Sequence, residues 1–449
     1  MSMKLRVWDT GRLIGELEHD GDYNRYSFEY SRHWAEAGNP LSPKLPLARS
    51  EETSAERHSA DVRNFFQNLL PEGRALDDAA STHNISKANL AGLLHALGRE
   101  STGAFMFTSD TSAPYDKPEA PPRALSYDAL SKRIQARPHK PFTVWDGRLR
   151  LSIAGYQDKL AVLQFDGEWF LPECAQHSST HILKPEPVNP LLAGMTTNEL
   201  MCMLLAESVK LSVAETHLVH VPEPVLVIQR FDRKYVAATN TVWRLQCIDG
   251  CQALGLPVDF KYEQPYGDGE DVKDIRDGAS VKQFFALLNN KELMRATGPA
   301  KLAFLRWVIF QVLIGNTDAH AKNLTFFSDS KRLALAPAYD LVSGLALIDA
   351  DVTDSLAMAV GDNFSPRGIR AYDWALMAHE CKIAPKLVVN VLTVLASQCL
   401  KQLPDIRQQV LEQGGDARMV ERVSEVVYSQ CTAALSGVDE IMAIGLDNF

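Results

Sequence analysis

Paired cysteines, long hydrophobic runs and excess positive charge are all scarce in this sequence. Its seven cysteines are scattered, and only Cys247 and Cys251 lie close together, with no second Cys/His pair to complete a zinc site. Such sparse thiols fit a reducing compartment. The most apolar stretch, residues 302–314, contains Arg306 and is too short to span a bilayer, and the N-terminal segment has no signal-peptide core. We therefore expect a soluble, cytoplasmic protein with no membrane partner.

The charge balance argues against direct binding of nucleic acid. The chain has 46 Lys and Arg against 56 Asp and Glu, which gives a net charge of −10. Binding to a phosphate backbone needs a concentrated basic surface. Any contact with DNA is therefore expected to be indirect, through a partner protein.

The order of elements predicts an α+β chain with two lobes. Alternating apolar and polar side chains over residues 4–30 predict hairpins, whereas residues 60–97 have helical spacing. A polar stretch with several prolines, residues 109–123, is typical of a linker. Beyond about residue 275 nearly everything is predicted to be helical, apart from one hairpin. The expected divisions are an N-terminal region over 1–110, a linker over 111–125, a small lobe over 126–240 and a helical large lobe over 241–449, with the chemistry between the lobes.

Two local signals refine this outline. Asp166-Gly167 separates two apolar runs and predicts a hairpin turn. Thr196 or Thr197 precedes an apolar periodic stretch and is the expected N-cap of a helix.

The stretch from 314 to 344 contains the strongest chemical pattern. Asp318 and Asn323 lie five residues apart just after a helix expected to be buried, and two short strands then lead to Asp340. Phosphoryl transfer needs a carboxylate to accept a hydroxyl proton and oxygen ligands for Mg²⁺. We therefore predict Asp318 as the catalytic base and Asn323 and Asp340 as metal ligands. Lys322 is expected near the transferred phosphate.

Residues upstream supply candidates for holding ATP. Lys184 lies in an apolar strand, and Glu199 opens the next predicted helix, so this acid is expected to orient the lysine. Alternatively, Lys184 lies at an exposed strand end, because Pro185 follows, and Glu199 only caps its helix. One hairpin earlier, a turn with a single glycine could present N–H groups to phosphate, or could be an ordinary hairpin. Its residues are Ser152, Ile153, Ala154, Gly155, Tyr156 and Gln157.

Several motifs in this order resemble the HipA family of bacterial toxin kinases. The resemblance runs from near residue 4 to at least residue 370. It rests on Asn64-Phe-Phe-Gln-Asn-Leu-Leu-Pro71, Gly98-Arg-Glu-Ser-Thr-Gly103, Ser152-Ile-Ala-Gly-Tyr-Gln-Asp-Lys159, Thr180-His-Ile-Leu-Lys184, Gln229-Arg-Phe-Asp-Arg233, Thr317-Asp-Ala-His-Ala-Lys-Asn323 and Pro337-Ala-Tyr-Asp340.

This resemblance implies a two-lobed protein-kinase-like fold and serine/threonine kinase activity with ATP and Mg²⁺. It also implies a HipB-type DNA-binding antitoxin that represses the operon together with the toxin. The implied substrate is an aminoacyl-tRNA synthetase such as the glutamyl enzyme. Ser152 is the implied site of inactivating autophosphorylation, since a phosphoserine there would repel the ATP phosphates. Gln229 and Phe231 are expected to contact adenine, with Gln229 replacing an expected acid, and His320 is expected to contact the nucleotide.

Two alternatives remain open from the residues alone. A small-molecule phosphotransferase acting on an antibiotic or sugar needs the same Asp and Asn/Asp pattern. A non-catalytic subunit of a repressor complex would retain antitoxin binding without activity, although the intact Lys184, Asp318, Asn323 and Asp340 argue against it.

Overall fold

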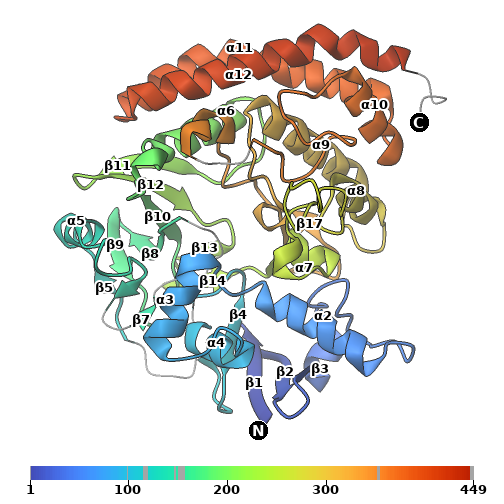
Figure 1. Cartoon of the computed structure of the whole chain (residues 1–449). Coiled ribbons are helices and arrows are strands. Elements are labelled where there is room, and N and C mark those ends of the chain that lie inside the picture. Colours follow the sequence, from blue (N-terminus) through green and yellow to red (C-terminus); the bar gives the residue numbers. More distant parts are fainter. Residues whose placement is uncertain are drawn as a thin grey trace. The chain divides into compact units, whose positions relative to one another are not determined.

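The computed structural model describes residues 2–98, 100–114, 120–145, 148–149, 157–350 and 354–444. The chain forms two compact units, each assembled from separate stretches of sequence (Figure 1). The first contains residues 1–185, 220–258 and 326–333, and the second contains residues 186–219, 259–325 and 334–449. The fold is α+β, as the sequence predicts.

The N-terminal part of the first unit is a four-stranded antiparallel sheet in the order β3-β2-β1-β4. Its strands are β1 (Ser2–Asp9), β2 (Arg12–Asp20), β3 (Arg25–Tyr30) and β4 (Phe105–Thr108). Thr10 and Gly11 both have positive φ and close the first hairpin, which confirms the predicted hairpins. The predicted helical stretch is also confirmed, as α2 (Ala55–Gln67), α3 (Gly73–His83) and α4 (Leu90–Leu97), preceded by α1 (Arg32–Ala37).

A second sheet in the first unit runs in the order β12-β10-β8-β9-β5. Its strands are β5 (Arg123–Ala124), β8 (Leu160–Phe165), β9 (Glu168–Leu171), β10 (His181–Pro185) and β12 (Pro224–Gln229). The turn between β8 and β9 is Asp166-Gly167, as predicted, with both residues at positive φ. The other elements are α5 (Tyr127–Gln135), β6 (Val144–Trp145), β7 (Arg148–Leu149), β13 (Arg233–Val236), β14 (Thr241–Arg244), β15 (Cys247–Asp249) and α7 (Gly250–Leu254).

The second unit is mainly helical. Its long helices are α6 (Met195–Ser208), α8 (Val281–Asn289), α9 (Thr297–Leu313), α10 (Ala371–Glu380), α11 (Pro385–Glu412) and α12 (Ala417–Gly437). Shorter elements are β11 (Thr216–His220), β17 (Ala334–Leu335) and the 3-10 turns η2 (Pro190–Leu192), η3 (Val258–Phe260), η4 (Ala321–Asn323), η5 (Gly344–Ala350) and η6 (Val438–Ala443). Strand β16 (Thr325–Phe327) begins in this unit, and its last two residues belong to the first unit. Helix α9 is buried over most of its length, which confirms the predicted core helix. Residues 354–370 form turns and irregular backbone, so the expectation of nearly continuous helix is wrong there.

The predicted N-cap of α6 is also wrong. The helix begins at Met195, and Thr196 and Thr197 lie inside its first turn. The carboxylate of Glu186 takes over the capping, because it accepts hydrogen bonds from the backbone N–H groups of Met195 (2.9 Å) and Thr196 (3.3 Å) and from the Thr196 hydroxyl. An acid from the preceding loop thus satisfies the unpaired N–H groups of the helix start.

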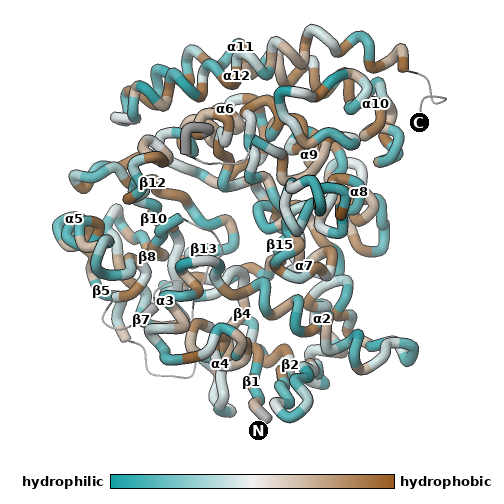
Figure 2. The backbone as a smooth tube through the Cα atoms, in the orientation of Figure 1, coloured by the Kyte–Doolittle hydropathy of each residue, from teal (hydrophilic) through white to brown (hydrophobic). Residues whose placement is uncertain are grey.

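Among the described residues, α11 is the one helix that is long and apolar enough to cross a membrane by length and composition. Core helices of soluble proteins share this length and composition. In the structure α11 packs against α6, α9 and α12. Teal and brown alternate along α11 and α12 in Figure 2, as expected for amphipathic helices that cover a core.

Candidate active site

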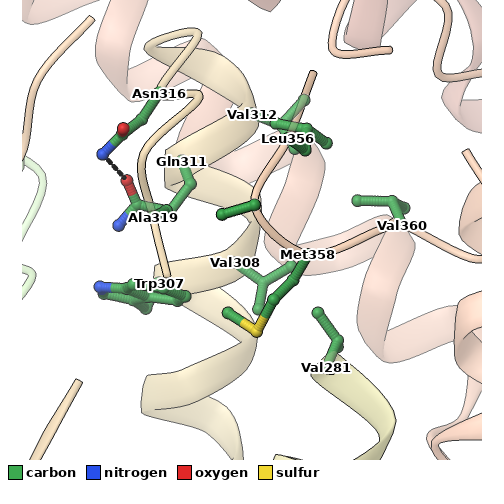
Figure 3. Close-up of a pocket in the computed structure, with 11 residues that line it drawn as sticks. Val281, Trp307, Val308, Gln311, Val312, Asn316, Ala319, Leu356, Met358 and Val360 are labelled. Carbon is green, nitrogen blue, oxygen red and sulfur yellow. Dashed lines mark hydrogen bonds between the residues drawn. The ribbon is translucent and has the colours of Figure 1, made fainter. Parts of the chain in front are cut away.

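The loop that contains Asp318 is held by the end of α9. Asn316, which is buried, donates a hydrogen bond from Nδ2 to Gln311 Oε1 (2.8 Å) (Figure 3). Its Oδ1 accepts a hydrogen bond from the Asp318 N–H (2.9 Å). One amide side chain therefore connects the last turn of the helix to the candidate base. The spacing of Asn316 two residues before Asp318 is an Asx-turn signal that sequence reasoning missed.

Below this loop the structure is closely packed. Trp307, Val308, Ala319, Leu356 and Met358 are among the residues that line a small cavity of about 20 Å³ (Figure 3). Such a volume holds about one water molecule and is too small for a nucleotide. The apolar floor supports the loop and leaves Asp318 on the exposed side.

The structure brings Asp318 and Asn323 into contact. The Asn323 Nδ2 donates to the backbone carbonyl of Asp318 (2.8 Å), across the 3-10 turn η4. This bond uses the amide nitrogen of Asn323, so its Oδ1 is the side-chain atom of this residue that could bind a metal. His320 and Lys322 lie on the same loop, and both are buried.

Asp340 is connected to the same loop through its neighbour. The Tyr339 hydroxyl donates to the Lys322 carbonyl (2.7 Å) and lies 2.9 Å from the Thr325 Oγ1. Asp340 itself has φ +57°, a left-handed conformation that is uncommon outside glycine. It lies five residues beyond β17 rather than at the end of that strand.

The segment after Asp340 is fixed from two sides. Asn198 of α6 forms two hydrogen bonds with the backbone of Ser343, one to its carbonyl (3.0 Å) and one from its N–H (2.7 Å). Gly344 approaches Thr317 so closely that an added Cβ would lie 2.1 Å from Thr317 Oγ1. The Asp318 loop and the Asp340 segment are therefore packed directly on each other.

The remaining predicted residues are distributed between the two units. In the first unit, Lys184 is buried in β10 opposite Leu226, so it does not lie at an exposed strand end. Gln229 is exposed at the end of β12, Phe231 packs edge-on against Phe327 at 5.8 Å, and Gln157 is half-buried. Ser152, Ile153, Ala154, Gly155 and Tyr156 lie outside the described residues. In the second unit, Glu199 is fully buried within α6, beyond the capping positions.

A buried ion cluster in the first unit connects Glu100 of one sequence motif with Arg230, Asp232 and Arg233 of another, and no pattern in the sequence predicts this connection. Arg230 binds Asp232 with both Nε (2.9 Å) and Nη2 (2.8 Å), and Arg233 Nη1 reaches the same carboxylate at 2.7 Å. Glu100 adds a second acid, 3.8 Å from Arg230. Burial alone would raise the pKa of Asp232, but the two guanidinium groups outweigh it and hold this pKa well below its usual range.

Asn323 and Asp340 are oxygen-donor residues of the kind that can bind magnesium. Mg²⁺ is usually bound by one or two carboxylates together with waters and substrate phosphates. The Asn323 amide oxygen and the Asp340 carboxylate match that description. Over the described ranges, no three His, Cys, Asp or Glu side chains gather into a complete metal cage.

The structure has an exposed aspartate whose carbonyl accepts a hydrogen bond from an asparagine amide, on a loop packed against the segment that follows a second aspartate. This arrangement is expected of a kinase-type phosphotransferase. Two family models match the chain, the HipA N-terminal domain over residues 5–108 and the HipA-like C-terminal domain over residues 151–403. The chain belongs to the HipA family.

Individual relatives cover nearly the whole chain. It is 33% identical to the serine/threonine-protein kinase toxin HipA of Shewanella oneidensis, over 98% of both chains. It is 31% identical to a putative kinase of Sinorhizobium fredii, over 94% of this chain and 96% of that one. The solved complex of Shewanella oneidensis HipA, HipB and operator DNA contains a similar structure, with a TM-score of 0.86 and 32% identity over 98% of this chain and 100% of that chain.

Proposed function

We propose that this chain is a serine/threonine-protein kinase toxin that transfers the γ-phosphoryl group of ATP to a protein serine. The observation that supports this most directly is the Asp318–Asn323 hydrogen bond on a loop packed against the Asp340 segment. The family membership supports the same activity, because the Shewanella oneidensis relative is named as such a kinase.

In the proposed reaction, the oxygen of the acceptor serine hydroxyl attacks the γ-phosphorus. Asp318 accepts the proton of that hydroxyl at the same time. The bond from that phosphorus to the bridging oxygen breaks, and ADP leaves. Bound Mg²⁺ would neutralise charge on the phosphates. Asn323 and Asp340 would hold the metal, and Lys322 would offset the charge that develops on the transferred group.

The residues proposed to bind the nucleotide are those that the sequence motifs predict. Lys184 would hold the phosphates and Glu199 would orient it, while Gln229, Phe231 and His320 would contact the nucleotide. The loop Ser152, Ile153, Ala154, Gly155, Tyr156 and Gln157 would cover the phosphates, with Ser152 as the autophosphorylation site. We propose the domain boundaries that the sequence predicts. These are an N-terminal region over 1–110, a linker over 111–125, a small lobe over 126–240 and a large lobe over 241–449.

The proposed partner is a HipB-type DNA-binding antitoxin, because the similar solved structure is titled as a complex with HipB and operator DNA. DNA would be contacted through this antitoxin, and the two proteins would repress their operon together. The proposed substrate is an aminoacyl-tRNA synthetase, and the proposed location is the cytoplasm.

Mass spectrometry of the purified chain tests this proposal. We expect one added phosphate on the peptide that contains Ser152 in the wild type, and none in Asp318→Ala, because the variant lacks the base. Labelled ATP with purified glutamyl-tRNA synthetase or with candidate aminoglycosides and sugars then separates a protein kinase from a small-molecule phosphotransferase. Labelling that is equal in the wild type and Asp318→Ala would contradict the kinase assignment.

A further inference from the structure

Asp318 has a hydrogen-bond partner that the reaction described above does not use. The hydroxyl of Tyr262 donates to Asp318 Oδ1 at 2.6 Å, from a segment 56 residues earlier in the chain. The Tyr262 ring also packs edge-on against His320, with 5.1 Å between ring centroids. Tyr262 therefore touches two side chains of the candidate catalytic loop at once.

The backbone around Tyr262 is fixed on several sides. The Lys261 carbonyl accepts the Ala321 N–H (3.0 Å), which links the segment directly to η4. The N–H groups of Gly278 and Ala279 donate to Glu263 and Phe260 (3.2 and 2.9 Å). A Cβ at Gly278 would lie 1.7 Å from the Tyr262 carbonyl oxygen. The two backbone segments can therefore approach each other only because residue 278 is glycine.

Glu263 anchors the segment from below. Its buried carboxylate accepts hydrogen bonds from Arg276 Nε (2.8 Å) and from the Ala359 N–H (2.8 Å), and its own N–H donates to the Ala357 carbonyl (2.9 Å). These contacts hold the residue next to Tyr262 against residues 357–359. The phenol is thus presented to Asp318 by a clamped backbone and not by a mobile loop.

We propose that Tyr262 is a positioning residue that holds the Asp318 carboxylate in one orientation for phosphoryl transfer. With Oδ1 occupied by the phenol, Oδ2 is the oxygen left to accept the proton of the acceptor hydroxyl. A general base must lie within hydrogen-bond reach of the proton it removes, and a small displacement of a reacting group lowers the rate strongly. This inference rests on the proposed kinase function and adds a residue that acts through the base.

A different role is also testable at this contact. A phenol hydrogen-bonded to the base could occupy the place of the acceptor hydroxyl and block it. The clamped backbone argues against this, because a blocking group has to leave when the substrate arrives. The two roles predict opposite changes in rate when the hydroxyl is removed.

The experiment compares wild type, Tyr262→Phe, Tyr235→Phe and Asp318→Ala. Tyr235 is the matched control, because its hydroxyl also donates to a side-chain oxygen, that of Asn240 at 2.9 Å, in the first unit. Transfer of labelled phosphate from ATP to the chain itself is followed over a range of ATP concentrations. We expect Tyr262→Phe to lower the maximal rate roughly ten- to hundredfold, with an unchanged half-saturating ATP concentration and an unchanged melting temperature.

Tyr235→Phe is expected to behave as the wild type. An unchanged rate in Tyr262→Phe would overturn the positioning role, and a faster rate would overturn it in favour of blocking. A weaker half-saturation by ATP with an unchanged maximal rate would also overturn it. Equal labelling of wild type and Asp318→Ala would remove the kinase proposal itself, so the two failures can be told apart.

Discussion

At the scale of single residues, the contact between Gly344 and Thr317 couples the candidate base to the candidate metal ligand. Gly344 follows Asp340 by four residues, and Thr317 directly precedes Asp318. The 2.1 Å separation between a Gly344 Cβ and Thr317 Oγ1 is far below any tolerated contact, and the Thr317 backbone N would lie only 3.1 Å away. A side chain at 344 therefore requires the Thr317 side chain to rotate or one of the two segments to shift.

We expect Gly344→Ala to lower the rate of phosphate transfer roughly a hundredfold, because displacements of about 1 Å at a catalytic group have such effects. Adding Thr317→Ala removes the clashing oxygen and should restore part of the rate. Gly298→Ala is the control, since a Cβ at that position of α9 meets nothing within 4 Å. Rates measured with labelled ATP check this, and a wild-type rate in Gly344→Ala would show that the two segments are not coupled.

At the scale of elements, helix α2 is joined to strand β3 through a histidine. The His58 Nε2 accepts a hydrogen bond from the backbone N–H of Phe28 (3.3 Å), which requires that nitrogen to be unprotonated. Burial, together with the nearby charge of Arg49, lowers the pKa of His58 from its ordinary value of 6.5. The folded chain therefore binds this proton less readily than the unfolded chain does.

This difference predicts a stability that depends on pH. As the pH drops below 6.5, His58 takes up a proton in the unfolded state before it does so in the folded state. The free energy of unfolding should therefore fall between pH 6.5 and the lower pKa of His58 in the folded chain. The change should stay under about 1 kcal/mol, because the side chain is only half-buried. Urea unfolding of wild type and His58→Gln at pH 7.5 and pH 5.5 measures it. An equal fall in the free energy of unfolding of the wild type and His58→Gln would show that other groups cause the pH dependence.

Most of the local structure could be predicted from the sequence, because it is set by near neighbours. The hairpin at Thr10-Gly11, the turn at Asp166-Gly167 and the buried helix before Asp318 all follow from spacing and turn chemistry. The Asp318–Asn323 pairing also follows, since five residues span one tight turn. Contacts between distant segments could not be predicted in this way.

Three features show why. The N-terminus of α6 is capped by Glu186, nine residues before the helix begins, so the N-cap predicted from the nearby threonines is wrong. Tyr262 reaches Asp318 across 56 residues, and its surrounding sequence contains no motif. The Asp232 carboxylate accepts the Gly103 N–H from 129 residues away. Each of these contacts is decided by tertiary packing, which a single sequence does not specify.

At the scale of the whole molecule, the buried ion cluster holds the N-terminal region to the rest of the first unit. Arg233 donates hydrogen bonds to the carbonyls of Ser101 (2.8 Å) and Gly103 (2.8 Å). The Gly103 N–H donates a hydrogen bond to the Asp232 carboxylate (2.8 Å). The Ser179 hydroxyl donates to Glu100 (2.8 Å). Removing Arg230 takes away two of the guanidinium hydrogen bonds to the Asp232 carboxylate and leaves Arg233 to bind it in a dry environment, which is unfavourable.

We expect Arg230→Met to lower the free energy of unfolding by about 3–5 kcal/mol, the usual effect of breaking a buried ion pair. Arg407→Met is the control, since the Arg407–Glu421 pair is exposed and should contribute at most about 1 kcal/mol. Urea denaturation midpoints of the two variants provide the comparison. Equal midpoints would mean that the cluster is dispensable for stability.

The interleaving of the two units has a consequence for how such a protein is made and destroyed. The first unit is not complete until residue 333 has been synthesised, by which point the Asp318 loop already exists. Folding during translation therefore cannot finish one unit before the other begins. Conversely, a single proteolytic cut anywhere from residue 186 to residue 325 divides both units at once. We therefore expect one cleavage in this range to destabilise both units together.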